Sequence, residues 1–83
     1  MLKFHIIFDI TLLGDATETV ALGGTYVDAG ATATDDTDGN MTTKIKTINP
    51  VDTSKAGTYI ITYNVSDWAG NYAEQVTRTV TVE

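Results

Sequence analysis

Two short segments of the chain gather the side chains that could bind a metal ion. One is DDTDGN at 35–40 and the other is DWAGN at 67–71. Calcium takes about six to eight oxygen ligands, mostly from carboxylates and carbonyls. Asp36, Asp38, Asp67 and Asn71 are therefore candidate calcium ligands if both segments are loops at one end of the fold. The pattern lacks the bidentate glutamate of an EF-hand loop, and Asp, Gly and Asn also form turns without any metal. Calcium is thus a possible cofactor, and a pair of solvated turns is the alternative.

The other reactive residues do not assemble into a catalytic set. The chain has no cysteine, which excludes disulfides, thiolate zinc sites and thiol nucleophiles. His5 is the single histidine, so no cluster of histidines can form around it. Carboxylates such as Glu18 and Glu74 would need a cleft and a raised pKa to act as an acid/base pair, and no pattern indicates either. We expect no enzyme activity.

Length and charge exclude further classes of function. The chain has 83 residues and a formal net charge of −6, and its five Lys and Arg residues are scattered rather than clustered. Nucleic acid is therefore an unexpected partner, because binding to phosphates needs a basic patch. No apolar run approaches the roughly 20 residues of a membrane-spanning helix. We expect a soluble, monomeric chain with no membrane insertion and no export signal of its own.

The hydrophobic pattern is that of β-strands. Apolar residues alternate with period two in the segments 2–12, 17–22, 26–34, 41–48, 58–65 and 73–82, and turn-forming residues separate them. In the third segment, Val27, Ala29, Ala31 and Ala33 share one face of an expected central strand. Six or seven short strands at this spacing predict an all-β sandwich or small barrel, built as a single domain over residues 1–83.

The last strand carries one charge in its apolar set. Arg78 falls in phase with Val76, Val80 and Val82, which would place it on the inward face. A buried guanidinium requires a counter-charge. We therefore expect a structural role for Arg78, as the ion-pair partner of the acidic loops or of Asp28.

From Ile10 onward the sequence resembles a bacterial immunoglobulin-like domain, a module of secreted and cell-surface proteins. The resemblance is carried by YVDAGATATD, GTYIITYNVSD and AGN followed by TRTVTV, and it extends over about residues 10–82. Residues 1–9 depart from the family pattern, which usually opens with a proline-bearing linker. The resemblance implies an immunoglobulin-like antiparallel β-sandwich of about seven strands. It also implies an extracellular or cell-surface location, with neighbouring domains of a larger protein as partners.

The resemblance to immunoglobulin domains implies a structural role for Tyr59. It lies two residues before Ile61, which takes the position of a disulfide cysteine in antibody domains. This resembles a tyrosine corner, in which the phenol bonds a backbone group a few residues upstream.

Three functions remain open at this stage. The resemblance favours a non-catalytic spacer or adhesion module of a bacterial surface or secreted protein. One alternative is a calcium-stabilised module that binds a glycan or protein through its end loops, where Trp68 could stack on a sugar ring. The other is a self-assembling module, because the apolar segment Phe4–Phe8 could add a strand to another chain's sheet.

Overall fold

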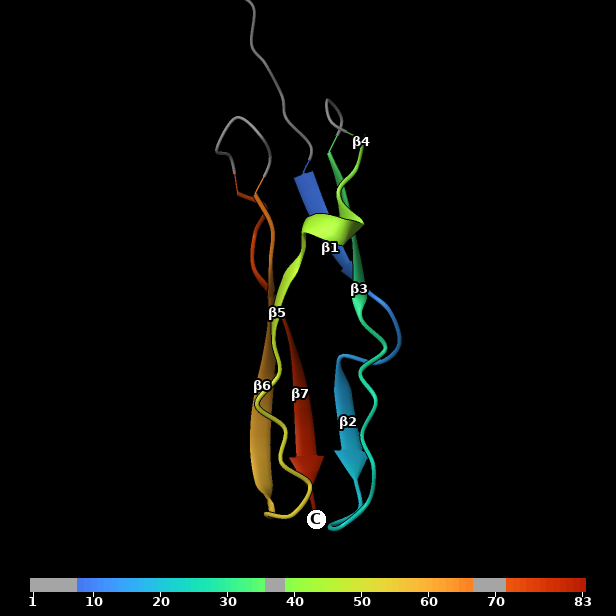
Figure 1. Cartoon of the computed structure of the whole chain (residues 1–83), viewed down its shortest axis with the longest axis vertical. Coiled ribbons are helices and arrows are strands. Elements are labelled where there is room, and N and C mark those ends of the chain that lie inside the picture. The colour runs from blue at the N-terminus through green and yellow to red at the C-terminus, as the bar shows by residue number, and fades with distance from the viewer. Residues whose placement is uncertain (1–7, 36–38, 67–71) are drawn as a thin grey trace, which may run out of the picture.

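Two sheets face each other in the computed structural model, which describes residues 8–35, 39–66 and 72–83. The strands are β1 (Phe8–Leu12), β2 (Thr17–Val20), β3 (Ala31–Asp35), β4 (Gly39–Asn40), β5 (Lys46–Ile48), β6 (Gly57–Asn64) and β7 (Val76–Val82). One sheet has the order β1-β3-β4 and the other β2-β7-β6-β5 (Figure 1). The predicted all-β immunoglobulin-like sandwich is confirmed.

The first strand of the sandwich is divided between the two sheets. β1 pairs antiparallel with β3, and β2 pairs parallel with β7. The chain changes sheets at Gly14, whose φ of 74° is readily adopted only without a side chain. The break that the sequence predicts at this glycine is present. The other strand pairs of the described chain are antiparallel.

The core lies between the two sheets, and the longest strands, β6 and β7, contribute to it. β6 and β7 pair over seven positions, from Gly57↔Val82 to Tyr63↔Val76. Their inward residues are the ones that the alternation predicts. The buried apolar residues of the described chain are Ile10, Ala33, Met41, Ile61, Tyr63, Val65, Ala73, Val80 and Val82.

The expected strand over 26–34 is wrong in its first half. β3 begins only at Ala31, and Val27 is 82% exposed instead of inward. The cause is Gly30, whose φ of 83° interrupts the extended backbone and shifts the alternation by one residue. Before Gly30 the half-buried positions include Tyr26 and Asp28, whereas after it the buried positions are Ala33 and Asp35. Because of this shift, the carboxylate of Asp28 lies on the inward side of the chain.

The expected strand over 41–48 is also shorter than the pattern indicates. Thr42–Lys44 forms a 3-10 turn, η1, and β5 follows with three residues. The side chain of Thr42 explains the turn, because its Oγ1 accepts the Ala33 N–H at 3.1 Å and so ties the turn to β3. Within the part of the chain that the structure describes, no helix has the length and apolar character needed to cross a membrane.

Candidate functional site

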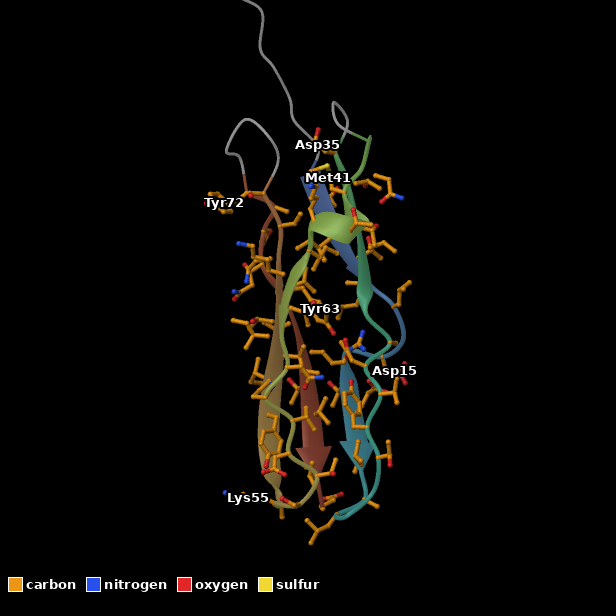
Figure 2. All side chains as sticks on the ribbon, in the orientation of Figure 1. Asp15, Asp35, Met41, Lys55, Tyr63 and Tyr72 are labelled. Carbon is orange, nitrogen blue, oxygen red and sulfur yellow. The ribbon has the colours of Figure 1, made fainter. Side chains whose placement is uncertain are left out.

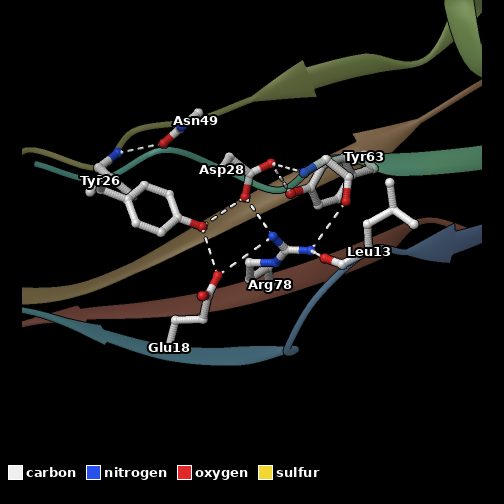
Figure 3. Close-up of polar contacts among 9 residues, drawn as sticks. Leu13, Glu18, Tyr26, Asp28, Asn49, Tyr63 and Arg78 are labelled. Atoms are coloured by element: carbon white, nitrogen blue, oxygen red, sulfur yellow. Dashed lines mark hydrogen bonds and ion pairs between the residues drawn. The ribbon is translucent and has the colours of Figure 1, made fainter.

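The best-defined polar site of the described chain surrounds Arg78 on the inward face of β7 (Figure 3). Its side chain has no exposed surface. Burial of a charge costs several kcal/mol unless an opposite charge and hydrogen bonds compensate for it. The surrounding residues must therefore supply both.

Three segments that are distant in sequence supply them. Arg78 Nη1 lies 2.8 Å from Asp28 Oδ1 and 3.5 Å from Glu18 Oε1. Nη2 donates to the carbonyl oxygens of Leu13 and Gly30, the latter at 3.2 Å. Nε has no hydrogen-bond partner within the described residues. The guanidinium thus ties β7 to the β1–β2 connection, to β2 and to the segment before β3.

Asp28 is saturated with hydrogen bonds from four groups. Oδ1 accepts from Arg78 Nη1 and from the Tyr26 hydroxyl at 2.7 Å. Oδ2 accepts from the Gly30 N–H at 3.1 Å and from the Tyr63 hydroxyl. A carboxylate has about four acceptor sites, and all of them are occupied here.

Two tyrosine rings complete the cluster. The Tyr26 hydroxyl oxygen lies between two carboxylates, 2.7 Å from Asp28 and 3.0 Å from Glu18, and its single proton is donated to one of them at a time. The Tyr63 ring centre lies 5.8 Å from the Arg78 guanidinium carbon, within cation–π range. We call these five residues, Glu18, Tyr26, Asp28, Tyr63 and Arg78, the Arg78 network.

The network shifts the pKa values of Asp28, Tyr26 and Tyr63 away from neutral pH, where a catalytic acid or base works best. Burial raises the pKa of Asp28, but the hydrogen bonds from Tyr63 and Tyr26 and the charge of Arg78 outweigh burial and hold the pKa below its ordinary value. Burial and the hydrogen bond to Asp28 raise the pKa of Tyr26 to about 12, and the same causes raise the pKa of Tyr63. Asp28 is therefore a poor proton acceptor and the tyrosines are poor donors at neutral pH.

The arrangement has the chemistry of a structural crosslink between the four-stranded sheet and the segments that follow β1 and precede β3. Each reactive oxygen of Asp28 is engaged, and Arg78 is sealed from solvent, so neither group is presented to a substrate. An open hollow of about 290 Å³ lies beside Tyr26 and is otherwise lined by neutral residues, Gly24, Thr25, Asn49, Val51 and Thr53. No pair of acidic and basic side chains is among these lining residues.

Tyr59 makes the hydrogen bonds that a tyrosine corner requires. Its hydroxyl lies 2.8 Å from the Lys55 carbonyl oxygen and 3.1 Å from that of Asp52, four and seven residues upstream. These contacts hold the connection between β5 and β6 against the start of β6.

The four expected calcium ligands lie outside the described residues. Asp36 and Asp38 fall in the interval 36–38, and Asp67 and Asn71 fall in the interval 67–71. In the ranges 8–35, 39–66 and 72–83, no group of three or more His, Cys, Asp or Glu side chains is placed to hold a metal ion. Calcium binding stays a prediction.

The sequence indicated only part of the Arg78 network. The inward position of Arg78 follows from the phase of β7, and that of Tyr63 from the phase of β6. Asp28 was one of two expected partners of Arg78, beside the acidic loops, and the structure pairs Arg78 with Asp28. Glu18 and Tyr26 were not anticipated. The available signal was the polar alternation Tyr26-x-Asp28 just before a glycine, which places two hydrogen-bonding side chains on one face.

Solved structures with the same fold are parts of larger proteins. The crystal structure of the lipoprotein BT2262 from Bacteroides thetaiotaomicron has a TM-score of 0.79 at 24% identity, over 92% of this chain and 37% of that chain. The structure of CBM51-2 in complex with GlcNAc and INT domains from Clostridium perfringens ZmpB has a TM-score of 0.65 at 27% identity, over 94% and 16%. The structure of the M60 catalytic domain with CBM51-1 and CBM51-2 from the same protein has a TM-score of 0.65 at 28% identity, over 92% and 8%.

The chain thus spans well under half the length of each of these proteins. A search of curated protein sequences found no match. The family model described as "Bacterial surface protein, Ig-like domain" matches residues 10–82, which include every member of the Arg78 network. By this match, the chain belongs to the family of Ig-like domains of bacterial surface proteins.

Proposed function

We propose that this domain is a non-catalytic structural module that spaces or presents neighbouring domains of a bacterial surface or secreted protein. The observation that carries the proposal is that the interior charges, Arg78 and Asp28, pair with each other. Arg78 and Asp28 crosslink the four-stranded sheet to the segment before β3, and their hydrogen-bonding groups are directed at each other and at neighbouring residues of the domain. Membership of a surface-protein family and the larger size of the similar chains agree with this role.

The path of the chain suits a module that bears tension. β1 starts at one end of the sandwich and β7 finishes at the other, where the C-terminus lies (Figure 1). Force applied through the two ends would pull β1 and β2 against β7 along the strand direction. The parallel β2–β7 pair resists through the bonds Thr79 N–H to Ala16 O at 2.8 Å and Glu83 N–H to Val20 O at 3.0 Å. Bonds loaded in this shearing direction share the force rather than break one at a time.

Single-molecule force spectroscopy tests the proposal. A tandem array of the domain pulled through its N- and C-termini should unfold in one high-force step for each copy. As a matched control, the domain is pulled between a Lys55→Cys attachment and the C-terminus. The chain has no other cysteine, and Gly57 pairs with Val82, so this geometry opens the β6–β7 ladder from its end.

The two directions should differ clearly in force. We expect a higher unfolding force through the termini than through the Lys55→Cys attachment. Equal forces, or a lower force through the termini, would refute the load-bearing role.

A further inference from the structure

The outer face of the four-stranded sheet differs in charge from the rest of the molecule. The outward residues of β7 are Thr77, Thr79 and Thr81, and their neighbours across the sheet include Thr19 of β2 and Thr62 of β6. None of the outward positions of β2, β5, β6 and β7 holds an acidic residue. The chain has a net charge of −6, but this face lacks the acidic residues that would repel a negatively charged ligand.

Basic and aromatic side chains gather at one end of this face. A hollow of about 90 Å³ is lined by Lys44, Lys46, Asn64, Val65, Ser66 and Tyr72. Tyr72 is 79% exposed and projects away from the sandwich (Figure 2). A backbone bridge between Ser66 and Tyr72 holds that tyrosine at the rim. An exposed aromatic ring beside the exposed Lys46 offers an apolar face and a positive charge to one ligand.

The polar groups of the hollow are donors. Gln75 Nε2 donates to Asn64 Oδ1 at 3.2 Å, which leaves Asn64 Nδ2 as the group that this amide can offer to a ligand. Lys46 and the Ser66 hydroxyl add further donors. The ligand should therefore bring acceptors, one of them charged.

We propose that this hollow binds the carboxylate and adjoining ring edge of an acidic sugar, such as a uronic acid. Lys46 would pair with the carboxylate, Asn64 and Ser66 would bond ring hydroxyls, and the apolar face of the ring would lie on Tyr72. The volume of about 90 Å³ is several times the ~10 to 15 Å³ that a cavity needs to hold one water molecule, so the hollow has room for a carboxylate and its neighbouring atoms. The inference is independent of the spacer role.

A pair of small ligands separates carboxylate recognition from general sugar binding. Methyl glucuronide and methyl glucoside differ only in the carboxylate. Each is titrated into the ¹⁵N-labelled domain and followed by two-dimensional NMR. We expect the glucuronide to shift the amide signals of Lys46, Asn64 and Tyr72, and to bind roughly tenfold more tightly than the glucoside. Added salt should weaken binding, because Lys46 is exposed.

Variants assign the effect to the hollow. Lys46→Gln and Tyr72→Ala remove exposed side chains, so both variants should keep the Tm of the parent domain. We expect each to weaken glucuronide binding about tenfold, while the matched variant Lys55→Gln, at the opposite end of the domain, has no effect (Figure 2).

Three results would overturn the proposal. The first is the absence of shifts at these residues with tens of millimolar glucuronide. The second is equal binding of glucoside and glucuronide. The third is a loss of binding in Lys55→Gln as large as in Lys46→Gln, since net charge alone would then explain it.

Discussion

Substitution of Asp28 by Asn should remove much of the domain's stability. The amide keeps one acceptor oxygen but replaces the other with an NH2 group, and it carries no charge. If the oxygen takes the Oδ1 position, the NH2 group faces two donors, the Gly30 N–H and the Tyr63 hydroxyl. Arg78 meanwhile keeps only Glu18 as a counter-charge, at 3.5 Å and 32% exposed. Loss of one partner of a buried ion pair costs about 3 to 5 kcal/mol.

This loss is large for a domain of 83 residues. Domains of this size lose about 4 to 8 °C of Tm per kcal/mol. At about 3 kcal/mol, Asp28→Asn should therefore lower the Tm by roughly 12 to 24 °C, measured by circular dichroism at neutral pH. Asp15→Asn serves as the matched control, because Asp15 is exposed on the β1–β2 connection and its loss should leave the Tm unchanged.

A double variant separates the effect on stability of removing both Asp28 and Arg78 from the effect of removing Asp28 alone. In Asp28→Leu/Arg78→Met the fully buried charge is removed, and only Glu18, which is 32% exposed, loses its counter-charge. This variant should therefore be more stable than Asp28→Leu alone. A Tm for Asp28→Asn within 2 °C or so of the parent domain would refute the view that Arg78 depends on Asp28.

Four further outcomes are expected. The stability that Asp28 contributes is fully present above the pKa of an unfolded aspartate, about 3.9, and is lost as the pH falls through the lower pKa of the folded state. The stability of the parent domain, measured by acid unfolding, should therefore fall over this pH range, whereas that of Asp28→Asn should lack this loss. At alkaline pH, the contribution of Tyr26 is present below about pH 10 and is lost as the pH rises through its pKa of about 12, and Tyr26→Phe should remove that step from a near-ultraviolet absorbance titration. Tyr59→Phe loses the hydrogen bonds to the Lys55 and Asp52 carbonyls and should cost about 1 kcal/mol, seen as a Tm lower by roughly 4 to 8 °C; an unchanged Tm would mean that the corner adds nothing. If the acidic loops bind calcium, the Tm with millimolar calcium should exceed that with chelator, by about 2.7 kcal/mol in stability at 100 times the dissociation constant; no rise at this concentration would exclude a site of useful affinity.

The sequence predicted most reliably where one alternation runs through a whole strand. β6 and β7 keep their phase over seven paired residues, so their inward residues, Arg78 included, could be assigned from the pattern. The pattern failed around Gly30, because a backbone change at a single glycine exchanges the two faces and alternation alone does not show whether a glycine has a positive φ. The same shift hid Tyr26 from sequence reasoning, since its inward position depends on that glycine.

The 3-10 turn at 42–44 was missed for another reason. Its residues have good strand propensity, but Thr42 bonds to the backbone of Ala33, nine residues away. Tertiary contacts of this kind override local preference.

The spacing of the Arg78 network along the chain sets the order in which its contacts form. Arg78 meets Leu13, Asp28 and Tyr63, and these contacts span 65 residues to Leu13 and 50 to Asp28. Contacts between such distant residues require the closure of long loops, so we expect them to form late in folding. Interactions absent from the folding transition state slow unfolding and leave the folding rate unchanged. The buried ion pair thus acts on the lifetime of the folded domain, and this lifetime is the property on which the proposed load-bearing role depends.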